Sequence, residues 1–232
     1  QQLMAQEQMA ATGRMAARVA HEINNPLAAI RSSLELIRMD NNEGRAIDAT
    51  LSLMNSELDR VSNIIRQMYG LYQPERNAVQ AVEVTSIIND CLTLLQSGAR
   101  QKNITLDCNC RHRLYAQASE AGLRQILFNI LQNALDASPR GKAVVVGIHE
   151  EGKRVIVNVD DEGPGLPEHE AQQLFEPFFT TKDSYGGSGL GLGLSVSASL
   201  VKGMGGSLEL QNRSEGGSRA VITLKAAPEN SV

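Results

Sequence analysis

The sequence predicts a multidomain α and α+β fold. An antiparallel helical hairpin would form a dimeric four-helix bundle, and an α/β sandwich domain would follow it. Residues 1–73 show almost no strand pattern and carry apolar side chains at helical spacing. Residues 74–81 contain a proline without clear periodicity, which is typical of a linker. From residue 82 to residue 232, short β-branched runs alternate with helical runs, as in a sheet covered by helices.

The predicted hairpin rests on two heptad seams separated by the turn sequence DNNEGR at residues 40–45. The first seam contains Met9, Ala16, Ala20, Ile23, Leu27, Ile30, Leu34 and Ile37. The second contains Ile47, Leu51, Met54, Leu58, Val61, Ile65, Met68 and Tyr72. A lone hairpin would bury only one side of each helix, so we expect a homodimer in which two hairpins form a four-helix bundle. The few large apolar residues at the start favour a coiled coil that continues upstream of this fragment.

The second half is expected to form a mostly antiparallel sheet with helices beside it. Strand patterns occupy residues 82–84, 103–109, 142–150 and 153–161. Helical patterns occupy residues 85–101, 119–137 and 190–204. Because aromatic residues make up only 3% of the chain, the core should be aliphatic.

Composition narrows the class of protein. The 232 residues are 42% hydrophobic and 21% charged, as in globular proteins, and the net charge of -4 gives no general attraction to nucleic acid. No apolar run reaches the length of a membrane span, and the first residues lack a signal-peptide pattern. We expect this fragment to be cytoplasmic, while an upstream membrane anchor in the full-length protein stays open.

The three cysteines, Cys91, Cys108 and Cys110, have no framework spacing, and their odd number favours a reducing compartment. Cys108 and Cys110 alternate in a predicted strand and would share one face. A metal site is the weaker interpretation, because only His112 offers a further ligand nearby.

Three clusters in the second half carry candidate chemistry. NILQNALDA, residues 129–137, places Asn129 and Asn133 on one face of a predicted helix, and an amide oxygen suits Mg²⁺. DDEGPGLP, residues 160–167, directly follows a strand. There Gly163 and Gly165 allow close backbone approach to a ligand, and a buried Asp161 could accept a hydrogen bond from an exocyclic amine.

The third cluster, GGSGLGLGLSV at residues 186–196, places glycines before a helix start, where backbone amides and the helix dipole favour a phosphate. It is neither the P-loop nor the dinucleotide fingerprint. Each cluster alone has an ordinary explanation: exposed asparagines, a simple turn and a flexible loop.

In their order and spacing, the clusters resemble the ATP-binding domain shared by sensor histidine kinases, DNA gyrase, MutL and the heat-shock chaperone ATPases. NILQNALDA is similar to the N box, DEGPG to the first glycine box, FEPFFTTK to the F box, and GSGLGLGL to the second glycine box. The resemblance implies that Asn133 holds Mg²⁺, that Asn129 lies near the phosphates, and that Asp161 contacts the adenine amino group. It also implies an adenine pocket shaped by Gly163 and Gly165.

The same resemblance implies that Lys182 lies near the phosphates. It places Gly187, Gly189 and Gly191 in the lid that closes over ATP.

HEINNP, residues 21–26, resembles the H box of the sensor histidine kinases, in which the histidine accepts the γ-phosphoryl group. His21 lies off the predicted seam, and Glu22 could accept a proton from its ring. Pro26 disturbs the helix beside His21 because it cannot bond to the carbonyl of Glu22. Asn25 shares the face of His21 and resembles the position that serves phosphatase activity toward the phosphorylated regulator. Alternatively, His21 is an inert exposed side chain, Glu22 a solvated carboxylate, and Asn25 a local partner at a tolerated kink.

These patterns predict a dimeric sensor histidine kinase core. Residues 1–73 would be the dimerisation and phosphotransfer hairpin, 74–81 the linker, and 82–232 the catalytic ATP-binding domain. It would use ATP and Mg²⁺, pass the phosphoryl group to an aspartate of a response regulator receiver domain, and follow an upstream sensor domain. A conformational ATPase clamp without phospho-histidine and a degenerate phosphotransfer scaffold are the alternatives. Whether phosphorylation occurs in cis or in trans stays open.

Overall fold

The computed structural model describes residues 20, 23–35, 37, 47, 50–55, 57–58, 61, 78–110, 112–167, 173–177, 179 and 191–229. These fall into two compact units, one made of the described residues up to 61 and the other of those from 78 onward.

The first unit is helical throughout its described residues. Residues 23–35 form one uninterrupted helical stretch that includes Pro26, whose side chain is buried. Along both seams, half-buried side chains such as Ile30 and Met54 alternate with more exposed ones. Four seam leucines are 46–50% exposed: Leu27, Leu34, Leu51 and Leu58. A single copy of the chain therefore leaves about half of each of these leucine side chains uncovered.

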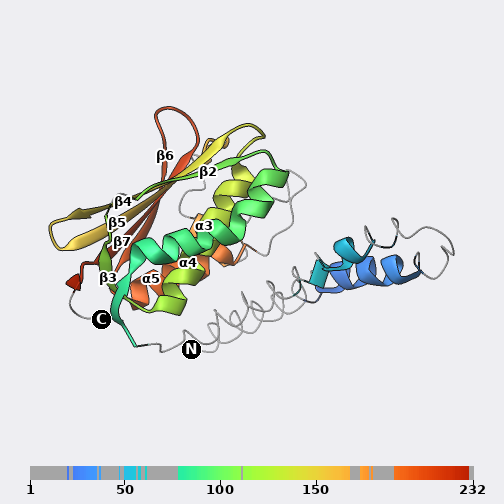
Figure 1. Cartoon of the computed structure of the whole chain (residues 1–232), viewed down its shortest axis with the longest axis horizontal. Coiled ribbons are helices and arrows are strands. Elements are labelled where there is room, and N and C mark those ends of the chain that lie inside the picture. Colours follow the sequence, from blue (N-terminus) through green and yellow to red (C-terminus); the bar gives the residue numbers. More distant parts are fainter. Residues whose placement is uncertain are drawn as a thin grey trace, which may run out of the picture. The chain divides into compact units, whose positions relative to one another are not determined.

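The second unit is built on a five-stranded sheet (Figure 1). Its order is β2 (Thr105–Asn109), β4 (Ala143–Glu151), β5 (Arg154–Asp160), β7 (Ser218–Lys225) and β6 (Ser207–Asn212). β2 runs parallel to β4, and the other three pairs are antiparallel. This arrangement confirms the predicted α+β layer with a mostly antiparallel sheet.

A smaller two-stranded antiparallel sheet pairs β1 (Gln80–Glu83) with β3 (Tyr115–Ala118). β1 takes the last two residues of the stretch predicted as a linker. Val84, predicted at the end of a strand, instead begins a helix. Its backbone N–H still donates to the carbonyl of Leu114 at 2.9 Å, in register with the β1–β3 pairing, so the strand pattern is followed up to the residue where the helix begins.

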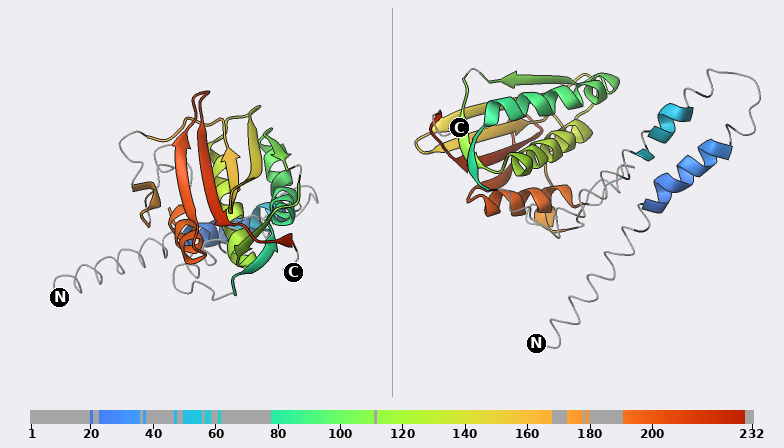
Figure 2. Two further views of the ribbon diagram at one scale, coloured as in Figure 1. Left: turned by 90° about the vertical axis from the view of Figure 1, so that its left-hand side faces the viewer. Right: turned by 60° about the horizontal axis from the view of Figure 1, so that its bottom comes forward.

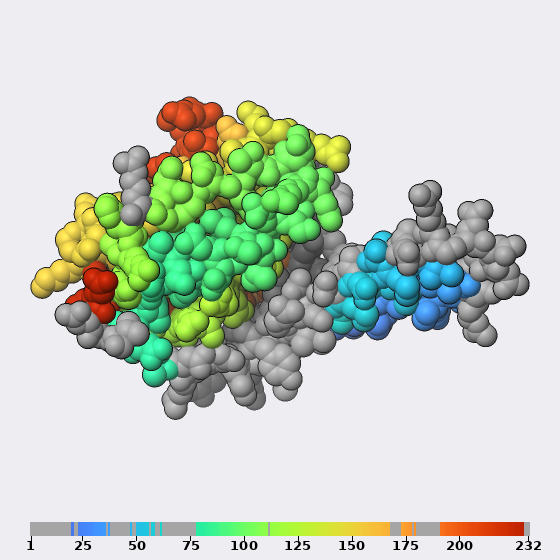
Figure 3. All heavy atoms as spheres, in the orientation of Figure 1, coloured from blue at the N-terminus to red at the C-terminus, as the bar shows by residue number. Residues whose placement is uncertain are grey.

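Three helices cover one face of the larger sheet, as two views show (Figures 1 and 2). They are α3 (Val84–Gln101), α4 (Glu120–Ala137) and α5 (Gly193–Gly203), with α4 between the other two. A 3-10 turn, η1 (Gln173–Phe175), contacts α5. Seen from the helical side, the side chains of α3 and α4 close over the sheet (Figure 3).

The core between the two layers is aliphatic, as the composition predicted. On α4 the buried residues Leu123, Ile126, Leu127, Ile130 and Leu131 recur at helical spacing. They face alternate residues of the central strands: Val144 and Val146, Val155, Val157 and Val159, and Ile222 and Leu224. This packing fixes the rotation of α4, and therefore the direction in which its polar face points.

Capping explains where α4 begins. Ser119 precedes it in an extended conformation, and its hydroxyl accepts a hydrogen bond from the N–H of Gly122 at 3.1 Å. Glu120 adds a negative charge in the first turn, and this charge interacts favourably with the positive end of the helix dipole.

The cysteines differ from expectation in one respect. Cys108 and Cys110 are joined by a disulfide, with their Cα atoms 5.4 Å apart, although their spacing gave no sign of a framework. Both lie against the core from the edge strand β2 and the residue after it. Cys91 is a free thiol that is completely buried on α3, and burial raises its pKa to about 11.

Among the helices that the structure describes, none combines the length and the apolarity that a membrane crossing requires.

Candidate functional site

The turn after β5 holds a buried carboxylate. The side chain of Asp161 is 5% exposed, and its Oδ1 accepts hydrogen bonds from the N–H of Gly163 at 2.8 Å and of Ser218 at 3.1 Å. The hydroxyl of Ser218 donates to Oδ2. Because an ionised carboxylate has about four acceptor sites, these three bonds leave one for a ligand. The carboxylate is therefore fixed in place and can only accept.

Two glycines in this turn sit where a side chain would not fit. A Cβ on Gly163 would lie 2.8 Å from the carbonyl oxygen of Ala137, at the end of α4. Gly165 has a φ of +83°, and a Cβ there would lie 2.8 Å from Oδ1 of Asn212. The turn therefore packs closely against α4 on one side and β6 on the other, as close backbone approach requires.

The two predicted asparagines lie where α4 passes the amino end of α5. The Nδ2 group of Asn129 donates, at 3.4 Å each, to the carbonyl of Gly193 and to the hydroxyl of Ser197. Gly193 is the first residue of α5, and a Cβ there would lie 3.9 Å from Nδ2 of Asn133. Asn129 and Asn133 thus share one face and meet the same helix terminus.

The amino end of α5 suits an anion. Its N-cap residue is Leu192, and no side chain caps the helix. The first N–H groups of a helix lack partners within it, and together with the dipole they favour a phosphate. The neutral amides of Asn129 and Asn133 beside this end add no negative charge. Their oxygens are of the kind that Mg²⁺ accepts.

Both parts of the site are aligned along α4. Asn133 lies one turn before Ala137, whose carbonyl borders Gly163, so the axial offset is about 6 Å at 1.5 Å per residue. The turn that holds the acceptor for an amine and the anion-binding end of α5 therefore both lie beside α4, about one turn apart along it. That combination suits a nucleotide, which has an amine on its base and phosphates at its other end.

Ser218 was missed by sequence reasoning. It lies 57 residues after Asp161, and the sequence around it matches no recognised motif. Only the pairing of β5 with β7 brings the two residues together. Beside it, Arg219 donates from Nε and from a terminal nitrogen to the two carboxylate oxygens of Asp160, each at 2.6 Å. These hydrogen bonds raise the pKa of Arg219.

Several predicted site residues lie outside the described residues, namely His21, Glu22, Lys182, Gly187 and Gly189. Gly191 is described, with a φ of +66°, two residues before α5 begins. Asn25 belongs to the first unit, where its side chain is exposed.

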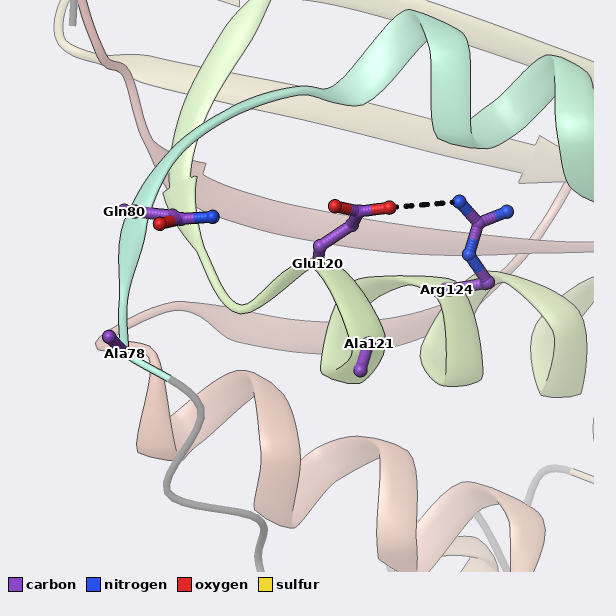
Figure 4. A pocket seen from close by; sticks show the side chains of 5 residues that line it. All are labelled: Ala78, Gln80, Glu120, Ala121 and Arg124. Carbon is purple, nitrogen blue, oxygen red and sulfur yellow. Dashed lines mark hydrogen bonds and ion pairs between the residues drawn. The ribbon is translucent and has the colours of Figure 1, made fainter. Parts of the chain in front are cut away.

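A separate pocket lies at the other end of α4 (Figure 4). It has a volume of about 430 Å³ and is lined by Ala78, Gln80, Glu120, Ala121 and Arg124. Arg124 is paired there with Glu120 at 3.1 Å and with Asp90 at 2.9 Å. These hydrogen bonds raise its pKa. The pocket contains none of the predicted nucleotide-site residues. The described residues contain no group of three or more histidine, cysteine or acidic side chains that could hold a metal ion.

Two family patterns match the chain. Residues 118–228 match the histidine kinase-, DNA gyrase B-, and HSP90-like ATPase family. Residues 11–77 match the His Kinase A (phospho-acceptor) domain. The first match contains Asn129, Asn133, Asp161 and Ser218, and the second contains His21 and Asn25.

Curated proteins are similar to this chain across both matched regions. The C4-dicarboxylate transport sensor protein DctB of Pseudomonas aeruginosa is 37% identical over 228 residues, which are 95% of this chain and 36% of that protein. The chain spans about a third to a half of the length of the first curated relatives it matches.

Solved structures of histidine kinases are also similar to this chain. The histidine kinase ThkA, in a crystal structure with the response regulator protein TrrA, matches 97% of this chain and 65% of its own chain. The TM-score is 0.71 and the identity 25%. The isolated catalytic domain of ThkA matches 65% of this chain and 97% of its own, with a TM-score of 0.57 and 27% identity. The phospho-acceptor match, the ATPase-domain match and these relatives together establish that the chain belongs to the two-component sensor histidine kinases, as a catalytic core.

Proposed function

We propose that this chain transfers the γ-phosphoryl group of ATP to His21 and then to an aspartate on a response regulator. The observation that carries the proposal is the buried Asp161 carboxylate in a turn packed against the end of α4. The same helix carries Asn133 and Asn129 one and two turns earlier, beside the uncapped amino end of α5. The match of residues 11–77 to a phospho-acceptor domain supports His21 as the acceptor.

The adenine end follows from hydrogen-bond polarity. The remaining acceptor site of Asp161 would receive the exocyclic amine of adenine. Guanine and hypoxanthine carry a carbonyl oxygen at the corresponding position, and a second acceptor facing a buried carboxylate is unfavourable. Gly163 and Gly165 would let the base approach the backbone.

The phosphate end would be held by the first N–H groups of α5, with Asn129 and Lys182 near the phosphates. Glycines 187, 189 and 191 would lie in the lid that closes over ATP. Asn133 is the proposed ligand of Mg²⁺, which when bound would neutralise charge on the phosphates. Phosphoryl transfer needs mainly positioning and such charge neutralisation, and the chain's own groups would supply the positioning.

At the acceptor, a nitrogen of the neutral His21 ring would form a bond to the γ-phosphorus as the bond to the ADP oxygen breaks. Glu22 would orient the ring and take its proton. The phosphoryl group would then pass from His21 to a carboxylate oxygen of the regulator, which leaves His21 ready for another cycle. Residues 74–81 would allow the ATP-binding domain to reach His21 and to leave it.

The partners proposed are a second copy of the chain, a receiver domain and an upstream sensor domain. Support for the second copy comes from the half-exposed seam leucines, since a four-helix bundle would bury them. Support for the receiver domain comes from the similar kinase ThkA, which was crystallised with a response regulator.

The decisive experiment is incubation of the chain with γ-labelled ATP and Mg²⁺. We expect a label that is lost in acid and stable in base, as for a phospho-histidine, and we expect His21→Gln to remove it while ADP affinity stays unchanged. His149→Gln, an exposed histidine on β4, is the control and should label like wild type. ATP hydrolysis without a protein-bound label would favour the conformational clamp, and neither activity would favour the scaffold.

A phosphatase role is proposed for Asn25. Its exposed amide could hold a water in line with an aspartyl phosphate on a docked regulator. Asn25→Ala should therefore slow dephosphorylation of the cognate regulator while His21 labelling stays near normal. If both activities fall together with thermal stability, Asn25 has only a structural role.

A further inference from the structure

The hairpin between β6 and β7 fastens the adenine-binding turn at both of its ends. This turn runs from Asp161 to Leu166. Asn212 is the last residue of β6, and Arg213 follows it directly. The side chain of Arg213 reaches the start of the turn, and that of Asn212 reaches its end.

At the start of the turn, a terminal nitrogen of Arg213 donates to the backbone carbonyl of Asp161 at 2.7 Å. The Arg213 side chain is only 20% exposed. Its Nε lies 3.8 Å from Asp160, whose carboxylate is already held by the shorter paired bonds of Arg219. The short charge-assisted hydrogen bond of Arg213 is therefore the one to the backbone carbonyl of Asp161. Asp161 is the residue whose side chain would bind the base.

At the end of the turn, the amide of Asn212 binds both backbone groups of Leu166. Its Oδ1 accepts from the N–H of Leu166 at 2.6 Å, and its Nδ2 donates to the carbonyl of the same residue at 3.1 Å. Oδ1 also occupies the space that a Cβ on Gly165 would need. An amide is required for this pairing, because a carboxylate could only accept.

From these contacts we propose that Asn212 and Arg213 are positioning residues that set the base specificity of the nucleotide site. The inference rests on the proposed nucleotide-binding function. Asp161 can distinguish an amine from a carbonyl only if its free oxygen stays in place relative to the base, within about 0.5 Å. Gly163 and Gly165 contribute no side chains that could hold the turn, so its position depends on contacts from other elements. Asn212 and Arg213 are such anchors, and neither needs to touch the nucleotide.

The test compares the binding of ADP with that of inosine diphosphate, which has a carbonyl in place of the exocyclic amine. Dissociation constants are measured by calorimetry on the complete 232-residue chain for wild type, Arg213→Ala and Asn212→Ala. We expect wild type to prefer ADP, and each substitution to reduce that preference by about tenfold, which corresponds to the loss of one good hydrogen bond. Most of the change should be weaker ADP binding. Arg213→Lys, which keeps a charged donor, should recover part of the preference.

The matched controls are Gln211→Ala, an exposed neighbour on β6, and Arg154→Ala, an exposed arginine at the opposite end of β5. Both should keep the wild-type preference. Thermal unfolding is recorded for every variant, since a purely structural role would lower stability and weaken both nucleotides equally.

Two results would overturn the proposal, and they differ. If wild type binds ADP and prefers it, but the preference stays within twofold in both Arg213→Ala and Asn212→Ala, the positioning role alone is wrong. If wild type binds neither nucleotide, the proposed nucleotide site is wrong, and the positioning role falls with it.

Discussion

Asp161 is held through its backbone as well as its side chain. Its N–H donates to the carbonyl of Ser218 at 2.9 Å, and its carbonyl accepts from Arg213. With the three bonds to its carboxylate, nearly every polar group of the residue has a fixed partner. A preorganised acceptor of this kind needs no rearrangement when a ligand binds. Replacing one carboxylate oxygen of Asp161 by an amide nitrogen therefore tests the role of that oxygen directly.

Asp161→Asn is the corresponding prediction. The amide oxygen can still accept from Gly163 and Ser218, but the amide nitrogen replaces the oxygen that would face the base, and it can only donate. We expect ADP to bind about 10- to 100-fold more weakly, from the loss of a hydrogen bond and an unfavourable donor–donor contact worth about 1–3 kcal/mol. Calorimetry measures this effect. Asp107→Asn, an exposed aspartate on β2, should bind ADP like wild type. Equal affinities for the two variants would remove Asp161 from the site.

At the scale of elements, the β6–β7 hairpin is shaped by two consecutive glycines that differ in one respect. Gly216 and Gly217 both have positive φ angles, +92° and +82°. A Cβ on Gly216 would meet open space, whereas a Cβ on Gly217 would lie 2.0 Å from the carbonyl oxygen of Asp161. The hairpin therefore approaches the turn at Asp161 more closely than any side chain at 217 permits.

The pair gives a matched test. Gly216→Ala should lower the free energy of unfolding by about 1–2 kcal/mol, the cost of a left-handed conformation, and should leave ADP binding unchanged. Gly217→Ala carries the same backbone cost and must also push the hairpin away from Asp161. We expect a clearly larger loss of stability together with loss of ADP binding. Thermal unfolding and calorimetry on both variants distinguish the two effects, and similar behaviour of both would contradict the close packing.

At the scale of the whole molecule, the half-exposed leucines of the first unit allow a test of the proposed second copy of the chain. Leu58 is 50% exposed in one copy and lies mid-seam on the second predicted helix. In a four-helix bundle a glutamate there would be buried without a counter-charge, at a cost of several kcal/mol. Leu58→Glu should therefore give monomers or unfolded hairpins while the ATP-binding domain still binds ADP.

The control is Leu94→Glu on α3, where the leucine is 66% exposed. This variant should keep the wild-type dimer. Light scattering after size-exclusion chromatography gives the mass of each variant, and a Leu58→Glu dimer of wild-type stability would exclude the bundle.

Much of this protein was determined by local sequence. The apolar spacing of residues 120–137 predicts α4 because helical periodicity alone decides which face is buried, and the same periodicity places Asn129 and Asn133 together. The alternation of residues 143–160 predicts β4 and β5 in the same way. The glycines of the turn after β5 were also found from sequence, since a strand followed by Asp-x-Gly-x-Gly marks a turn. In each case the physical cause acts between residues that are near in the chain.

Other features were decided only by tertiary structure. Ser218, Asn212 and Arg213 have no local signal, because their roles depend on strand pairing that brings β6 and β7 against a turn about 50 residues earlier. Val84 followed a strand pattern and keeps a hydrogen bond to Leu114 in register with β1 and β3, yet it is the first residue of α3. The disulfide between Cys108 and Cys110 was likewise not predicted by the spacing of the cysteines. Short-range periodicity thus determined which elements form and which residues lie on their faces. Long-range hydrogen bonds decided how the site's turn is held, because one chain pattern permits many pairings and only the packed sheet selects among them.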